Sequence, residues 1–425
     1  MTSTPIGKIP AGIAVLPFYG TAAVFFLVLC VLMLLAADEL TRHYFSPHVL
    51  AIVHTAALGW GTMVIFGAAY QLLPVICERD LFSIPMAVAS YCLLTVGTLL
   101  MVWSFWGFRV RVSLIWGGAL VVASTLLYGI NACGTAFSSR QLGIHRLFMM
   151  VSALWLLITA VIGLLLAINL SHTFIPRPHV DVLKLHAHAG LAGWFLQLIT
   201  GVSAKLVPMF LLGKSKKTWL LYAALLLQNM GLVLFLADGY FNPITGKMLW
   251  YAGIVGLGTL AWLGYLVDTY CHRLRKKVET LMRHTAVSFG YLIAGFILLP
   301  MAYHAADVRW ATLYGTFLFL GWITGIILGK TFKTLPFIVW NIRYQQLHGK
   351  AHVPLPKQLY NERLTIYQFY LYLGAFSSLV IGMVTNETWV IRTALFLWLA
   401  LAVIYLVNVV KVLFHKPVFH HGTIT

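Results

Sequence analysis

Long apolar segments alternate with short polar ones along almost the whole chain. Each reaches the length of about 20 residues that a helix needs to cross a bilayer core. Twelve such segments are predicted, at about residues 11–37, 48–76, 84–106, 111–131, 146–170, 181–210, 218–238, 247–270, 284–303, 310–330, 365–385 and 389–413. The pattern therefore predicts an all-α integral membrane protein with about twelve transmembrane helices in a single polytopic domain, 1–425. The first segment is too long for a signal-peptide core, so we expect it to remain as a spanning helix.

The second, sixth and tenth segments carry the same spaced residues. HTAALGWGTMVIFGAAYQLLP (54–74) and HAGLAGWFLQLITGVSAKLVP (188–208) align without gaps at a His, a Gly-Trp pair, a Gly and a Pro. LGWITGIILGKTFKTLP (320–336) repeats the last four of these residues, and Thr316 stands where the other two copies have histidine. Copies in about 48–76, 181–210 and 310–336 predict a unit of four helices repeated three times, in a pseudo-three-fold arrangement.

Three histidines, His54, His186 and His188, lie near the outer ends of repeat-bearing segments. An ionisable side chain inside a membrane span is costly and is by default a functional-site hypothesis. Three imidazoles at one depth favour ligation of a metal or haem iron. Because His186 and His188 are two residues apart, they point about 200° from each other on a helix and should serve different neighbours. The alternative is that the three are neutral and hydrogen-bonded within the bundle, or line a polar pathway.

The repeated glycines and tryptophans each allow two interpretations. Gly67 and Gly201 can permit close helix approach, as small residues do in membranes, or can make room for a flat macrocycle. Trp60 and Trp194 can contact the edge of a cofactor or simply pack. His304, at the outer end of the ninth segment, is a candidate for the second shell around a cofactor.

The basic residues are distributed unevenly. Lys and Arg number 29 against 11 Asp and Glu, a net charge of +18. Of the 29, the N-terminus, the loops after even-numbered segments and the C-terminal tail hold 20, and the loops after odd-numbered segments hold 8. This bias predicts that both termini are cytoplasmic, in what we expect to be a bacterial cytoplasmic membrane. It argues for contact with membrane lipid and against a nucleic-acid partner.

The sequence also limits the chemistry. The acidic residues fall in loops or near segment ends, so no carboxylate proton relay is evident at mid-membrane. The five cysteines include no CxxCH, which excludes covalent attachment of a c-type haem to this chain.

Twelve spans, the three-fold repeat and HxHxGLxGW (186–194), followed by a Gly and LVP, resemble the catalytic subunit I of the heme-copper oxidase superfamily, in its C-type oxidase and nitric oxide reductase branch. The resemblance implies that His54 and His188 bind a low-spin b-type haem. It implies that His186 binds a second, high-spin haem or is a relic of that ligand, so one or two haem b groups are expected. The seventh segment has no histidine, unlike the family, which argues against copper.

The expected function is therefore electron transfer through a bis-His haem near the outer membrane face. The redox partner would be a quinol, an extracytoplasmic cytochrome or a partner subunit. The segment 331–364, expected as a cytoplasmic loop between spans ten and eleven, either docks such a partner or caps the bundle. Two alternatives stay open: an oxidoreductase that binds or reduces oxygen or nitric oxide at a five-coordinate haem on His186, and a haem-free transporter or scaffold subunit.

Overall fold

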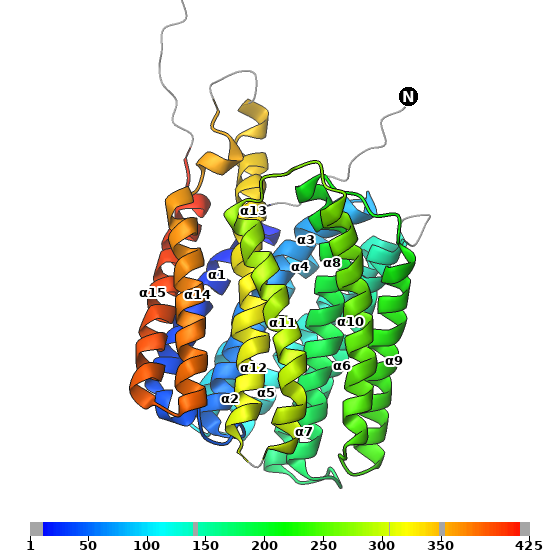
Figure 1. The fold of residues 1–425 in the computed structure, drawn as a ribbon, viewed down its shortest axis with the longest axis vertical. Helices are drawn as coiled ribbons and strands as arrows, with labels where there is room; N and C mark the ends of the chain where they lie inside the picture. Colours follow the sequence, from blue (N-terminus) through cyan, green and yellow to red (C-terminus); the bar gives the residue numbers. More distant parts are fainter. Residues whose placement is uncertain (1–11, 139–142, 306, 348–352, 417–425) are drawn as a thin grey trace, which may run out of the picture.

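The computed structural model describes residues 12–138, 143–305, 307–347 and 353–416, and within them the regular structure is helical. Among the described residues, twelve helices are long and apolar enough to cross a membrane, and they form one bundle (Figure 1). Nine spans are single α-helices: α1 (Leu16–Leu35), α4 (Ile84–Trp106), α5 (Val112–Phe137), α6 (Ile144–Ser171), α9 (Trp219–Phe241), α10 (Lys247–Cys271), α11 (Thr280–His304), α14 (Glu362–Thr385) and α15 (Thr388–Leu413). The all-α class and the number of spans predicted from the sequence are confirmed.

The three repeat-bearing spans are each an α-helix, a π-helical stretch and a second α-helix. They are α2–η3–α3 (Pro47–His54, Thr55–Thr62, Met63–Cys77), α7–η4–α8 (His179–His188, Ala189–Leu196, Gln197–Leu211) and α12–η5–α13 (Arg309–Thr316, Phe317–Ile323, Thr324–Arg343). Each π stretch begins directly after the repeat position held by His54, His188 or Thr316. Single π turns within α-helices are frequent at functional sites.

The twelve spans form three units of four consecutive spans, made of α1 to α5, α6 to α10 and α11 to α15. The three units are arranged in a ring. Unit one contacts unit two through α5 and α6, and it contacts unit three through α1 and α15. Within each unit the last two helices pack along each other, as α4 does with α5, α9 with α10, and α14 with α15. The pseudo-three-fold arrangement places the three repeat-bearing spans around the middle of the bundle, where 61–72% of their most apolar stretch is buried, against 22–50% for the other spans.

The repeated glycines face the first helix of their own unit. A Cβ on Gly67 would lie 2.8 Å from the Cβ of Phe18 on α1, and a Cβ on Gly201 would collide with Phe148 on α6. On Gly329 it would lie 2.7 Å from the backbone oxygen of Leu281 on α11. These contacts favour the interpretation that the repeated glycines permit close helix approach, because no larger side chain fits at these positions.

The repeated tryptophans link one unit to the next through hydrogen bonds. Trp60 Nε1 donates to Thr324 Oγ1, and Trp194 Nε1 donates to Thr62 Oγ1, both at 3.0 Å. Thr62 and Thr324 are equivalent positions of the repeat, and the third such position is Leu196. Leucine accepts no hydrogen bond, and the Nε1 of buried Trp322 has no partner among the described residues. Two of the three tryptophan–threonine hydrogen bonds that the repeat would allow between units are therefore present.

The expected loop 331–364 is partly helical. Helix α13 continues to Arg343 and carries Pro336 in its interior. The continuation is stabilised by burial of Phe332, Leu335 and Val339, which recur at helical spacing. Beyond it the segment includes two short 3₁₀ turns, η6 (Gln345–Leu347) and η7 (Pro356–Gln358), while residues 348–352 lie outside the described residues.

Candidate functional site

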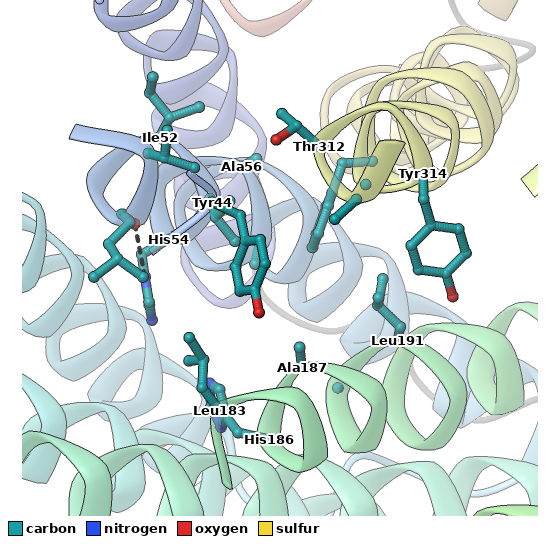
Figure 2. Close-up of a pocket in the computed structure, with 18 of the residues that line it drawn as sticks. Tyr44, Ile52, His54, Ala56, Leu183, His186, Ala187, Leu191, Thr312 and Tyr314 are labelled. Atoms are coloured by element: carbon teal, nitrogen blue, oxygen red, sulfur yellow. Dashed lines mark hydrogen bonds between the residues drawn. The ribbon is translucent and has the colours of Figure 1, made fainter. Parts of the chain in front are cut away.

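A cavity of about 780 Å³ lies between the three repeat helices in the part of the bundle where α2, α7 and α12 end. All three histidines singled out from the sequence, His54, His186 and His188, line it, as does Thr316. Its volume is within the range of about 300–1,000 Å³ typical of small-molecule and cofactor sites. Figure 2 shows α2, α7 and α12 presenting side chains to the same space.

Each histidine is oriented by a backbone carbonyl. His54 Nδ1 lies 2.7 Å from Leu50 O and His188 Nδ1 lies 2.8 Å from Lys184 O, both four residues earlier on the same helix. His186 Nδ1 lies 3.0 Å from Thr159 O on α6. A carbonyl oxygen only accepts, so Nδ1 carries the proton in each ring. The remaining nitrogen, Nε2, then keeps its lone pair, which is the state in which imidazole binds a metal.

The two positions that α7 fills with His186 and His188 recur in the other units. They are Ile52 and His54 on α2, and Tyr314 and Thr316 on α12. In the structure, His54, the second position of unit one, faces His186, the first position of unit two. In the same way, His188 of unit two faces Tyr314 of unit three. The ring centres of His54 and His186 are 6.4 Å apart with planes 17° from parallel, and those of His188 and Tyr314 are 6.1 Å apart at 21°.

The family resemblance pairs His54 with His188 as haem ligands, whereas the imidazole that the structure brings next to His54 is that of His186. His54 meets His186 rather than His188, because His186 and His188 leave α7 in nearly opposite directions. His188 points to the other side, where its ring centre lies 5.1 Å from that of Phe235 on α9. The divergence of the two side chains is the one predicted from their spacing, and it assigns each imidazole a different neighbour.

The other predicted site residues are dispersed. Trp194 lines the edge of the cavity, whereas Trp60 does not: its indole stacks on Phe26 with ring centres 4.5 Å apart. Gly67 and Gly201 lie deeper along their helices and contact α1 and α6, so they are outside the cavity lining. His304 is exposed at the end of α11 and lies on the cavity wall.

Sequence reasoning missed several residues of the cavity. Tyr314 and Thr312 come from α12, and Tyr44 precedes α2; all three are labelled in Figure 2. Tyr314 could have been predicted from the sequence, because it occupies the repeat position of His186. Nothing in the sequence singles out Gly163 of α6. Only the fold places it against the His186 ring, where a Cβ on Gly163 would lie 2.8 Å from His186 Cε1.

Across the part of the chain that the structure describes, no group of three or more His, Cys, Asp or Glu side chains comes together in a way that could hold a separate metal ion.

Comparison with known proteins gives one curated relative and a fold match. No protein-family model matches the chain. The cbb3-type cytochrome c oxidase subunit CcoN1 of Stutzerimonas stutzeri is 31% identical over 105 residues, which is 24% of this chain and 22% of the length of that relative. A chain in a cryo-EM structure of a heme-copper terminal oxidase dimer superposes with a TM-score of 0.69 at 10% identity, covering 97% of this chain and 86% of the other.

The fold match extends over nearly the whole chain, and the sequence match is independent of it. Both agree with the resemblance carried by the repeated motif, whereas fold alone does not establish activity. The protein has the fold of a heme-copper oxidase subunit I, and about a quarter of its sequence is similar to the subunit CcoN1 of a cbb3-type cytochrome c oxidase.

Proposed function

We propose that this protein is a membrane electron-transfer subunit in which His54 of α2 and His186 of α7 would hold a b-type haem. The spacing of these imidazoles carries the proposal. Two rings that bind one metal from opposite sides, each through a metal–nitrogen bond of about 2 Å, hold their centres about 6 Å apart. The observed 6.4 Å fits this arrangement.

The surroundings of the pair also suit a flat macrocycle. The ring of Phe105 lies 4.8 Å from that of His54, centre to centre, and provides an apolar wall on α4. Gly118 of α5 and Ala160 and Gly163 of α6 line the same part of the cavity and leave it wide because their side chains are small or absent. The two Nδ1 hydrogen bonds hold both imidazoles in the ligating tautomer.

Held by both His54 and His186, a haem would supply one-electron transfer rather than substrate binding, because the two imidazoles would leave no open coordination position. His54 and His186 would hold the group, and the carbonyl oxygens of Leu50 and Thr159 would fix the orientations of their rings. The redox partner would be a quinol, a cytochrome or a partner subunit. A cytoplasmic partner would dock on the surface formed by residues 344–347 and 353–361.

The test is a dithionite-reduced minus oxidised optical spectrum of the purified protein, with a carbon monoxide difference spectrum beside it. Sharp low-spin b-type bands that carbon monoxide leaves unchanged support the proposal. A carbon monoxide shift means an open coordination site and favours the oxygen- or nitric-oxide-binding alternative. A purified, folded protein without haem bands overturns the proposal and favours the haem-free alternative.

A further inference from the structure

The boundary between units two and three is packed more loosely than the other two boundaries. Helix α5 packs along α6 between units one and two, and α1 packs along α15 between units one and three, whereas α10 and α11 approach each other in only a few places. A cavity of about 130 Å³ lies in this boundary, and its lining is mostly apolar, with Val255 from α10 and Leu292 and Phe296 from α11. Helices α10 and α11 therefore leave a seam between them that other apolar groups can fill.

Three cations lie at the end of this boundary where α8 stops and α11 begins. Lys330 and Lys333 of α13 both lie over the ring of Phe210 on α8, with Nζ 5.1 Å and 5.7 Å from the ring centre. Lys333 forms an ion pair with Glu279, and Arg275 Nη1 lies 2.8 Å from the other oxygen of that carboxylate. This cationic cluster (Arg275, Lys330 and Lys333) shares one carboxylate among three positive charges, which leaves a net charge of +2.

Lys330 is the member of the cationic cluster that lacks an anionic partner. Its Nζ lies 3.2 Å from Met282 Sδ, and no ion pair among the described residues includes it. A thioether sulfur is a weak acceptor. Because the side chain is only partly exposed, its ammonium is incompletely hydrated, and an unpaired charge at the edge of a membrane span is costly. An anionic group beside Nζ would remove that cost.

The cationic cluster lies at the level of the helix ends. Phe210 is the last residue but one of α8, Met282 is the third residue of α11, and Lys330 contacts both. The ends of apolar spans mark the border between the hydrocarbon core and the headgroups of a bilayer. We therefore expect the ammonium of Lys330 at the depth of lipid headgroups.

The loop between α10 and α11 is fixed beside the cationic cluster. Leu274 N donates to Leu212 O at 3.1 Å, and Arg275 N donates to Leu211 O at 3.3 Å, so the loop is held against the end of α8. The side chains of Leu274 and Leu212 remain 80% and 61% exposed. Exposed apolar side chains next to cations suit contact with acyl chains and with the phosphates above them.

We propose that the boundary between units two and three binds one anionic phospholipid. Its phosphate lies at Arg275, Lys330 and Lys333, and an acyl chain enters the seam between α10 and α11. Charge complementarity carries the proposal, because basic sites between transmembrane helices select anionic headgroups. The site goes beyond the proposed electron transfer and requires no haem, since none of its residues lines the central cavity.

The probes are phosphatidylglycerol and phosphatidylcholine with the same acyl chains, added to the purified full chain in detergent. Native mass spectrometry counts the bound lipids. One phosphatidylglycerol should bind about fivefold or more tightly than phosphatidylcholine, which corresponds to about 1 kcal/mol for one cation near an anionic lipid. Equal binding of the two lipids would overturn the proposal. Displacement of phosphatidylglycerol by millimolar inorganic phosphate would also overturn it, because the site would then take the free anion.

Two variants change the charge of the cationic cluster in opposite directions. Lys330→Met removes the unpaired cation but keeps an unbranched apolar side chain, so it should weaken phosphatidylglycerol binding about fivefold. Glu279→Gln removes the shared carboxylate and frees Lys333 and Arg275 for the lipid, so it should tighten binding. Lys277→Met is the matched control, because it removes an exposed cation of the same loop outside the cluster and should bind as the wild type does.

Equal weakening by Lys330→Met and Lys277→Met would mean a general attraction between a basic surface and anionic lipid, and would overturn the proposed site. Glu279→Gln gives an independent answer if Lys330→Met does not fold. Unchanged or weaker binding of phosphatidylglycerol to folded Glu279→Gln would contradict the proposal. A haem spectrum of the same samples separates this site from the proposed function, since selective lipid binding without haem bands would refute only the latter.

Discussion

The imidazoles of His54 and His186 face each other at 6.4 Å between ring centres, although the two residues are not equivalent positions of the internal repeat. Equivalent positions are related by the pseudo-three-fold axis and lie on separate sides of the central cavity. Across the interface of α2 with α7, the contact instead joins the second position of one helix to the first position of the next. The same rule pairs His188 with Tyr314.

This pairing predicts which histidines are needed for haem. His54→Ala and His186→Ala should each lower the haem content of the purified protein by at least about tenfold, since loss of an oriented metal ligand costs no less than loss of a residue that supports one. His188→Phe should retain the b-type bands, because His188 faces α9 and α12. Haem is quantified by pyridine haemochrome per mole of folded protein. Loss in His188→Phe with retention in His186→Ala would favour the His54–His188 pair implied by the family resemblance.

Gly163 should control the position of the His186 ring. A Cβ added there would lie 2.8 Å from His186 Cε1, so Gly163→Ala should displace the imidazole and lower haem occupancy in a protein that still folds. Gly253→Ala is the matched control: it makes the same change in helix α10, where a Cβ meets nothing within 4 Å. Both variants gain a similar helix propensity, of about 0.5–1 kcal/mol. Equal haem content in the two variants would contradict the proposed site.

The incomplete ring of tryptophan hydrogen bonds predicts a stabilising substitution. Leu196→Thr should let Trp322 donate as Trp60 and Trp194 do, and should raise the free energy of unfolding by about 1 kcal/mol. Thr62→Val should lower it by about 1–3 kcal/mol, because it leaves the buried Trp194 indole without an acceptor. Unfolding in mixed detergent micelles measures both. A destabilised Leu196→Thr variant would show that Trp322 does not turn toward this position.

The charge bias predicts the orientation of the chain. Cys271 is exposed at the end of α10, beside a basic loop, and should react with a membrane-impermeant maleimide in inside-out vesicles but not in right-side-out ones. Cys92 is also exposed, but it lies within the apolar span α4, where lipid shields it. Cys271→Ser should abolish the inside-out signal. Labelling of Cys271 from the outer side would reverse the assigned topology.

The number of spans, their class and the repeat were all predictable from the chain. Apolar runs of this length have one stable form in a bilayer, because a helix satisfies its own backbone hydrogen bonds. The repeat was visible because each unit needs a glycine where it packs on its first helix, as Gly67 does on Phe18, and a tryptophan that reaches the next unit, as Trp60 does to Thr324. Such local requirements leave the same residues at the same spacing.

The identity of the histidine pair depended on the tertiary structure. The spacing of His186 and His188 showed that they serve different neighbours, but not which one would meet His54, since that depends on how neighbouring units are rotated around the pseudo-three-fold axis. The contact of Gly163 with His186 is likewise set by how α6 packs on α7. The sequence by itself determined that imidazole side chains lie within the membrane-spanning helices. The packing of the three units decided which side chains share a cavity, because the contacts of His54 with His186 and of His188 with Tyr314 join residues more than 100 positions apart.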